Sequence, residues 1–283
     1  MEKNIQNISW RKYPHRATTI TIGNYKGGVG KTTNTVLIGY TLAKMGIKTL
    51  VIDLDPQSNA TKALMLTKLA ESPENQITTI DKTLMRGIQE NNLEDLPVEI
   101  FQNLDLMPSF IDFEDFPKYL YQHTNSEREE DYFLSKLLKP VKEKYEMILI
   151  DVPPMSIEVT KNAVIASDYV LISLQTQERS LTGAENYIQQ LQKLQELYEL
   201  DLEVVGILPV LQKNRGTVDQ YILENSKELF GEENLFKTII PQMERIKRFD
   251  VSGITNEDRH DEKVLELYKE VTAELLERLA QFQ

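Results

Sequence analysis

A glycine-rich segment with two lysines and two threonines carries the residue types that bind phosphate. It follows a β-branched apolar run at residues 18–22, precedes a helical pattern at residues 34–44, and reads Lys26-Gly27-Gly28-Val29-Gly30-Lys31-Thr32-Thr33. A turn between a strand and a helix directs free backbone N–H groups and the positive end of the helix dipole at an anion. Glycines let those N–H groups approach phosphate oxygens. The segment therefore predicts a phosphate-binding loop that takes ATP.

The second lysine departs from the usual loop pattern G-x-x-x-x-G-K-[ST]. That pattern requires glycine at position 25, where this chain has Tyr25 followed by Lys26. In the common pattern Lys31 reaches the β- and γ-phosphates and the Thr32 hydroxyl ligates Mg²⁺. Lys26 adds a further positive charge to the same loop. A chance match is the alternative, and the combination of strand, glycines, Lys-Thr pair and helix disfavours it.

Two acids follow candidate strands at residues 49–53 and 147–151. Ligands of open parallel sheets bind outside the carboxyl ends of the strands, so Asp55 and Asp151 are expected near the phosphates. Asp151 ends a Walker-B-like strand and would hold Mg²⁺. Asp55 would position the attacking water or a Mg²⁺-bound water, the alternative being a helix-capping acid. Because no Glu follows Asp151, the sequence predicts slow hydrolysis, as in a timer or switch.

Composition narrows the class of protein. The chain has 283 residues, 41% apolar and 27% charged, and a net charge of −12. An acidic surface repels nucleic acid, so any DNA binding needs a local basic patch. The chain has no cysteine, which excludes disulfides, Fe–S clusters and thiolate zinc sites, and its three histidines are far apart. No bilayer-spanning run or secretory signal is present, so we expect a cytoplasmic protein without membrane association.

Apolar runs alternate with helical patterns along the chain. This alternation predicts an α/β fold with a doubly wound, mostly parallel sheet flanked by helices. The phosphate loop at residues 26–33 makes the expected fold one of the P-loop NTPase kind. We expect a flexible arm at 1–17 and a single ATPase domain at 18–283, with a loop-rich insertion of one or two helices at 67–103. The candidate strands are 18–22, 49–53, 104–107, 147–151, 169–174 and 204–208, and the candidate helices are 34–44, 131–144, 158–166, 181–200, 217–230 and 261–282. Thr182 and Glu185 could form a capping box at the start of the long helix.

At these motifs the chain resembles the ParA-type partition ATPases, in the deviant Walker-A group that also contains MinD-like proteins. Residues 26–33 match the family's deviant loop. The segment Asp53-Leu54-Asp55-Pro56-Gln57-Ser58-Asn59-Ala60-Thr61 resembles its first switch, and Asp151-Val152-Pro153-Pro154 resembles its Walker-B strand and second switch. Weaker likeness occurs at 104–109 and 239–241. The resemblance covers about residues 18–255 and fits residues 67–103 poorly.

The resemblance implies an ATP- and Mg²⁺-dependent cycle. Two subunits would pair face to face over the nucleotides as a homodimer, and Lys26 would reach the partner's phosphates. Lys31 and Asp55 would complete the catalytic set. The adenine would lie near Pro209, Pro241 and Met243. The dimer would bind DNA non-specifically on the nucleoid, and a centromere-binding, ParB-like partner would stimulate hydrolysis. The DNA segregated would be a plasmid or a chromosome, with a plasmid favoured.

A basic cluster in the C-terminal part is the candidate DNA surface. Residues 237–248 have a net charge of +3, because Glu244 is the one acid among four basic residues, Lys237, Arg245, Lys247 and Arg248. The alternative is a solvated helix start, since charge runs are commonly just solvated. The N-terminal arm is also basic, through Lys3, Arg11, Lys12 and Arg16 against Glu2. Few residues precede Lys26, so we expect no helix-turn-helix domain ahead of it and no sequence-specific DNA reading.

Three other functions fit parts of the sequence. A MinD-like membrane-positioning ATPase needs a basic amphipathic C-terminal helix, whereas residues 261–283 have a net charge of −3; we expect the apolar stripe of that helix to pack in the core or a dimer. A metabolic ATP-dependent ligase has the same fold class and rests on fold analogy alone. A scaffold with a dead nucleotide site is disfavoured by the presence of Lys31, Thr32, Asp55 and Asp151.

Overall fold

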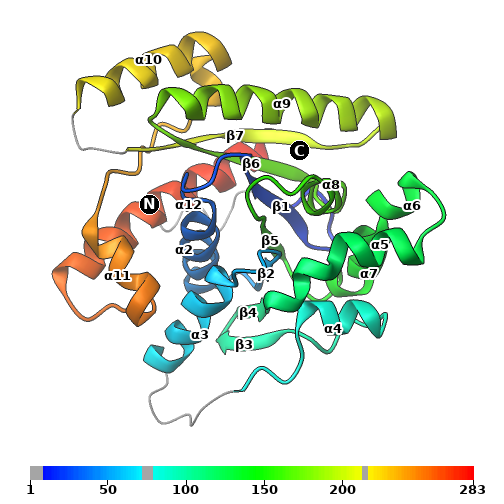
Figure 1. Cartoon of the computed structure of the whole chain (residues 1–283). Coiled ribbons are helices and arrows are strands. Elements are labelled where there is room, and N and C mark those ends of the chain that lie inside the picture. The colour runs from blue at the N-terminus through cyan, green and yellow to red at the C-terminus, as the bar shows by residue number, and fades with distance from the viewer. Residues whose placement is uncertain (1–8, 72–78, 212–215) are drawn as a thin grey trace.

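A mostly parallel sheet forms the centre of the molecule (Figure 1). The computed structural model describes residues 9–71, 79–211 and 216–283. Within them seven strands lie in the order β3-β4-β2-β5-β1-β6-β7. Their bounds are β1 Thr18–Gly23, β2 Thr49–Asp53, β3 Val98–Phe101, β4 Leu104–Met107, β5 Met147–Asp151, β6 Tyr169–Gln175 and β7 Glu203–Val210. The β3–β4 pair is antiparallel, and every other pair within the described residues is parallel. This confirms the predicted fold class.

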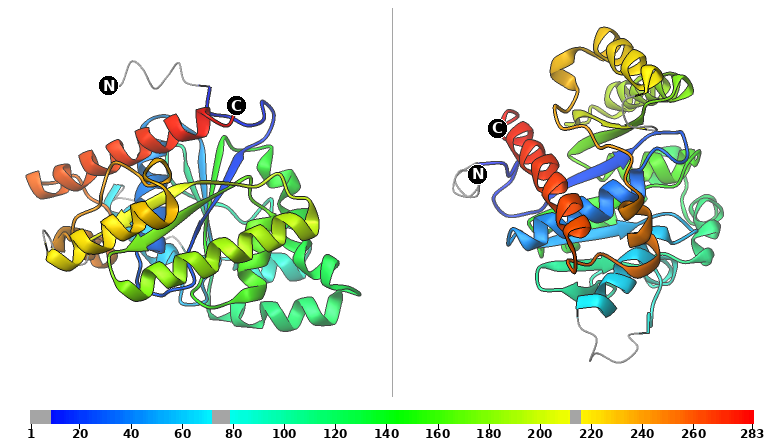
Figure 2. Two further views of the ribbon diagram at one scale, coloured as in Figure 1. Left: turned by 90° about the horizontal axis from the view of Figure 1, so that it is seen from above. Right: turned by 90° about the vertical axis from the view of Figure 1, so that its left-hand side faces the viewer.

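Helices cover both faces of the sheet, as the turned views in Figure 2 show. One face carries α2 (Lys31–Lys44), α3 (Asn59–Glu71), α11 (Glu244–Ser252) and α12 (Arg259–Ala280). The other face carries α4 (Leu84–Gln89), α5 (Phe116–His123), α6 (Glu127–Asp131), α7 (Phe133–Lys142), α8 (Ile157–Ile165) and α9 (Glu178–Tyr198), with α10 (Thr217–Phe230) beside α9. The short 3₁₀ turns η1 (Ile111–Asp115) and η2 (Glu232–Asn234) complete the connections.

The central strands are apolar throughout because both faces are buried. In β2, Leu50 and Ile52 pack into the cluster under α7 and α8, while Val51 packs under α2 and α12. Successive strand residues point to opposite faces, so two packed layers require an unbroken apolar run. The same alternation runs through β5. The core thereby fixes the strand ends that carry the acids.

The structure differs from the prediction at the less regular elements. The insertion at 67–103 contains the predicted helix as α4 but also β3, an edge strand with an irregular register that the sequence analysis missed. The predicted helix at 131–144 is found as α7 with slightly shorter bounds, and the short helix α6 before it was not predicted. At the start of α7 the side-chain oxygen of Asn162 accepts from Leu134 N at 3.0 Å. The predicted capping box is wrong. Helix α9 begins at Glu178, so Thr182 lies inside it.

The described part of the predicted N-terminal arm packs on the domain. Trp10 is buried, and the Arg16 guanidinium forms two hydrogen bonds with Asp168, at 2.7 and 3.1 Å. Lys12 pairs with Asp201, and Arg11 pairs with Glu146. Residues 9–17 are therefore held by ion pairs that use the arm's basic side chains. The arm's other charged residues, Glu2 and Lys3, lie outside the described residues.

Candidate nucleotide site

The phosphate loop joins the end of β1 to the start of α2 in the predicted way. Gly28 and Gly30 have φ of +74° and +90°. These left-handed values are strained for residues with a Cβ, so glycine is required at both turns. The Gly30 carbonyl accepts from Asn34 N at 2.8 Å, which starts the α2 ladder at the loop itself. The first N–H groups of α2 consequently face the loop, where an anion would lie.

The two lysines of the loop point to different places. Lys31 is 6% exposed, and its Nζ donates to the Lys26 carbonyl at 3.1 Å. Burial lowers the pKa of Lys31, while Asp151 and Asp55 act in the opposite direction. The Lys26 side chain instead lies against the first turn of α9, where its Nζ donates to Gln177 Oε1 at 2.5 Å and to Ser180 Oγ at 2.9 Å.

Asp151 is the most perturbed acid of the site. It is fully buried at the end of β5, and neither carboxylate oxygen has a hydrogen-bond partner within the described residues. Burial first, and then the neighbouring Asp53, raises the pKa of Asp151 well above its ordinary value; Thr32 and Lys31 oppose the shift. A buried, unpaired carboxylate is costly unless a cation satisfies it. The position is therefore suited to a ligand that brings positive charge.

This donor set fits Mg²⁺. The ion prefers a few protein oxygens together with water and substrate phosphates. Thr32, Asp55 and Asp151 could supply hydroxyl and carboxylate oxygens beside the phosphate loop. Over residues 9–71, 79–211 and 216–283 no three His, Cys, Asp or Glu side chains form a complete metal cage. Phosphate oxygens and water would complete the coordination of a bound Mg²⁺.

The two acids at the end of β2 have different environments. Asp53 is fully buried and accepts from Asp55 N at 3.0 Å and from the Thr61 N and Oγ1, both at 2.8 Å. It thus caps the first turn of α3. Burial raises the pKa of Asp53 to about 6 despite these hydrogen bonds. Asp55 accepts from Gln57 N at 2.9 Å, within the loop that precedes α3. The helix-capping alternative therefore describes Asp53, and Asp55 remains the candidate for water positioning.

The loop also rests on polar residues that the sequence analysis missed. Ser173 Oγ donates to the Val29 carbonyl at 2.5 Å and accepts from Asn34 Nδ2 at 2.9 Å, and the Tyr268 hydroxyl donates to Asn34 Oδ1 at 2.8 Å. Asn24 bridges the Ser173 carbonyl and the Lys26 N–H. In the sequence, the one feature that could have indicated this support is the single serine, Ser173, within the apolar run of β6.

The two segments predicted to flank the adenine lie side by side. Ile240 N donates to the Pro209 carbonyl at 3.0 Å, and Leu211 N donates to the Ile240 carbonyl at 2.8 Å. A Cβ on Gly30 would be 3.6 Å from Val210, so this pair of segments adjoins the phosphate loop. Pro241 follows directly, and Met243 precedes α11 and is half-buried. Their proximity to the loop is consistent with an adenine position, which stays a prediction.

The predicted basic cluster divides into two groups. Lys247 and Arg248 are exposed on α11, with Lys247 paired to Glu244. Lys237 is exposed outside this helix, where its backbone N–H bonds to Glu274 of α12. Arg245 instead turns inward. Its side chain is 12% exposed and pairs with Asp258 and the fully buried Asp261. Arg245 therefore has a structural role in this fold.

We expect Arg245→Ala to destabilise the protein, whereas Lys247→Ala leaves stability unchanged. Burial alone would raise the pKa of Asp261, but hydrogen bonds from Arg245, Glu257 N and Thr255 lower it to about 2. The pair's contribution to stability is complete above the ordinary Asp value of 3.8 and is lost as the pH falls toward 2. Thermal unfolding at neutral pH checks this, and equal melting temperatures for the two variants would contradict the structural role.

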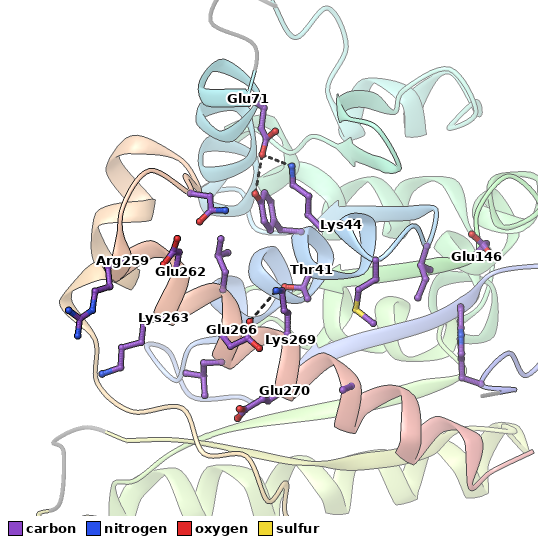
Figure 3. A pocket seen from close by; sticks show the side chains of 18 of the residues that line it. Thr41, Lys44, Glu71, Glu146, Arg259, Glu262, Lys263, Glu266, Lys269 and Glu270 are labelled. Atoms are coloured by element: carbon purple, nitrogen blue, oxygen red, sulfur yellow. Dashed lines mark hydrogen bonds and ion pairs between the residues drawn. The ribbon is translucent and has the colours of Figure 1, made fainter. Parts of the chain in front are cut away.

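A wide groove of about 1880 Å³ lies away from the phosphate loop, between α2, α12 and residues 9–11. Figure 3 shows Lys44 and Glu71 on one side and Lys263, Glu266 and Lys269 on the other, so charges of both signs line it. The apolar stripe of α12 is buried in the core, as expected for a packing helix. Within the described residues, no helix combines the length and apolarity that crossing a bilayer requires.

The chain is similar in sequence and in fold to several known proteins. Residues 17–204 match a family described as an AAA domain. The chain is 32% identical over 260 residues to the sporulation initiation inhibitor protein Soj of Bacillus subtilis, covering 90% of this chain and 98% of that protein. It is 30% identical over 236 residues to the chromosome-partitioning ATPase Soj of Treponema pallidum, covering 83% and 87%. An ATP complex of McdA from Cyanothece has a similar fold, with a TM-score of 0.75 at 23% identity over 93% of this chain and 97% of that one.

Proposed function

Because the chain belongs to the ParA-type family of partition ATPases, we propose that ATP converts it into a homodimer that binds DNA without sequence preference. Slow hydrolysis, stimulated by a centromere-binding, ParB-like partner, then returns the subunits to the free state. The protein would act on the nucleoid in the cytoplasm and serve DNA partition, with a plasmid as the favoured cargo.

The observation that carries this proposal is the pair of lysines on one phosphate loop. Lys31 is buried beside Asp55 and Asp151, where it can neutralise phosphate within its own subunit. Lys26 is partly exposed at the other end of the loop. A cation supplied across an interface stabilises the charge that develops during phosphoryl transfer. Lys26 would be that cation for a second subunit, once its side chain leaves Gln177 and Ser180.

Other residues of the site would support hydrolysis. Bound Mg²⁺ would neutralise charge on the phosphate oxygens. Thr32 and Asp151 would hold the ion, since Asp151 is the buried carboxylate with unpaired oxygens. Asp55 would orient the attacking water. The neighbouring segments contain two non-glycine residues with left-handed φ, Ser58 at +57° and Met155 at +58°. Strained backbone of this kind is common in segments that switch conformation.

The face that carries the nucleotide site exposes large apolar side chains. Phe110 and Ile111 follow β4, and Met155 and Ile157 follow β5, at the same edge of the sheet. Their exposed fractions range from 51% for Ile111 to 83% for Met155. Exposed apolar residues gathered at one face are typical of protein interfaces. This face would therefore bury its apolar side chains against a second copy of the chain.

A continuous path of contacts connects the nucleotide site to the candidate DNA surface. Helix α3 starts after the Asp55 segment, and α11 packs against it. Ile254 N donates to Thr67 Oγ1 at 2.9 Å, and a Cβ on Gly253 would approach the backbone of α3 to 2.5 Å. A displacement of α3 would therefore move α11 and its cations Lys247 and Arg248. This packing supports a DNA affinity that depends on the bound nucleotide.

A gel-shift experiment tests the proposed function. The purified chain is titrated onto unrelated DNA duplexes with ATP, with ADP and without nucleotide. We expect the chain to bind DNA in the presence of ATP but not with ADP or without nucleotide, and to bind all duplexes with equal affinity. Strong binding without nucleotide, or a preference for one sequence, would contradict the proposal.

Neutralising Lys247 and Arg248 together is expected to weaken DNA binding while ATP hydrolysis stays intact. Each lost phosphate contact lowers the slope of log affinity against log salt by roughly one, so the slope falls by about two per subunit. The matched control neutralises Lys136 and Lys139, which are exposed on α7 across the sheet. An unchanged slope in the first variant would place the DNA surface elsewhere.

A further inference from the structure

Lys26 is held within its own subunit by two neutral acceptors. Its Nζ donates to Gln177 Oε1 and Ser180 Oγ at the start of α9. Ser180 is fully buried, so its hydroxyl is a fixed acceptor. The backbone of Lys26 is anchored separately, because its N–H donates to Asn24 Oδ1 at 3.0 Å. The side chain can therefore leave α9 without any change in the start of the loop.

The start of the phosphate loop also contacts the N-terminal half of α9. A Cβ on Gly183 would be 3.2 Å from Asn24 Oδ1 and 3.6 Å from the Lys26 Cβ, so this glycine gives the loop its place on the helix. Tyr25 packs edge-on against Tyr187 of the same helix, with ring centroids 5.1 Å apart. The first turns of α9 thus form a resting place for the Tyr25–Lys26 end of the phosphate loop.

The electrostatics of this resting place favour exchange for an anion. Both acceptors are uncharged, and burial followed by the nearby Arg179 lowers the pKa of Lys26. A phosphate oxygen is a charged acceptor and forms a stronger, charge-assisted hydrogen bond with an ammonium group. Gln177 and Ser180 can therefore keep the Lys26 ammonium group bound when only water competes for it. A phosphate group, as the stronger acceptor, can displace them.

We infer that Gln177 and Ser180 form a latch that keeps Lys26 in its own subunit and thereby opposes pairing until nucleotide is bound. The inference rests on the proposed role of Lys26 at a partner's phosphates. Each subunit of a dimer must break its own two hydrogen bonds before its lysine can cross. The latch therefore raises the ATP concentration at which subunits pair and suppresses pairing without ATP.

The test measures the ATP concentration for half-maximal dimerisation by light scattering for wild type, Gln177→Ala and Gln177→Glu. The Ala variant removes one acceptor, and we expect its midpoint to fall about 10- to 150-fold, the range of one hydrogen bond to a charged group. The Glu variant supplies a charged acceptor, and we expect its midpoint to rise. ATP affinity measured in dilute, monomeric protein separates these shifts from changes in nucleotide binding. Gln189→Ala, an exposed glutamine of the same helix, is the control.

Opposite shifts of the dimerisation midpoint in Gln177→Ala and Gln177→Glu distinguish a latch from a structural role. Damage to α9 would shift the midpoint in the same direction in both variants. The Gln177 side chain makes no capping hydrogen bond to α9, so its loss leaves the helix start intact. Ser180→Ala is a second variant and should also lower the midpoint. If wild type pairs with ATP and Gln177→Ala has the same midpoint, the latch is overturned and the proposed function stands. If wild type never pairs with ATP, the proposed function fails and the latch fails with it.

Discussion

We expect Lys31→Ala to lower ATP affinity roughly 100-fold or more and thereby to abolish ATP-dependent dimerisation. Lys31 is nearly buried at the start of α2 beside two acids. Truncating one partner of a buried charge pair typically costs about 2–5 kcal/mol. Without this cation, Asp55 and Asp151 would face the phosphates with uncompensated negative charge. Binding of a fluorescent ATP analogue and sedimentation with and without ATP measure the two effects.

Lys44→Ala is the matched control for this variant. Lys44 is at the opposite end of α2, where it pairs with Glu71 at the surface. Both variants remove one lysine from the same helix and change the net charge equally. ATP affinity and pairing are expected to be intact in Lys44→Ala. An ATP-dependent dimer in Lys31→Ala would show that the loop does not bind phosphate as proposed.

Asp55→Asn is expected to bind ATP and DNA and to pair, but to hydrolyse ATP about 10²–10⁴-fold more slowly, the usual effect of losing a group that directs proton transfer. The asparagine oxygen can still accept from Gln57 N, as the Asp55 carboxylate does at 2.9 Å. The loop before α3 should therefore be preserved. Single-turnover hydrolysis at saturating ATP measures the chemical step without the contribution of subunit exchange.

A variant of the neighbouring Asp53 serves as a control that distinguishes a loss of catalysis from a loss of stability. Asp53 caps α3 through the Thr61 N and Oγ1, so Asp53→Ala should lower thermal stability. Asp55→Asn should retain the wild-type melting temperature. Turnover at the wild-type rate in Asp55→Asn would remove Asp55 from the catalytic role, whereas a lower melting temperature would assign it a structural one.

The regular parts of the fold could be predicted because their signals are local. The central strands form unbroken apolar runs, and the loop's glycines and lysines are contiguous in sequence, so both were found from residue types alone. The edge strand β3 was missed because a half-buried strand at a sheet edge has no comparable run. The start of α9 was missed because the residues that begin it, at Glu178, lack a capping side chain, while Thr182 offered a false one.

The site's long-range contacts could not be predicted, since nothing in one sequence pairs residues that are distant along the chain. Arg245 was placed in a DNA surface on charge alone, and its ion pair with the buried Asp261 depends on how α11 and α12 meet. Lys26 was expected to reach a partner's phosphates in the ATP-bound dimer, and that stays a prediction. Its contacts with Gln177 and Ser180 in the single subunit depend on the packing of α9 against β6. Residue type indicated the chemistry of these side chains but did not indicate their partners.

The hydrogen-bond chain from Tyr268 through Asn34 and Ser173 to the Val29 carbonyl has a consequence for the order of synthesis. The loop is made early by the ribosome, whereas Tyr268, in α12, is made 234 residues after Asn34. A nascent chain that ends before α12 lacks the hydroxyl that fixes Asn34, and with it the final support of the loop. We therefore expect full nucleotide affinity only after α12 has been synthesised and has docked on α2.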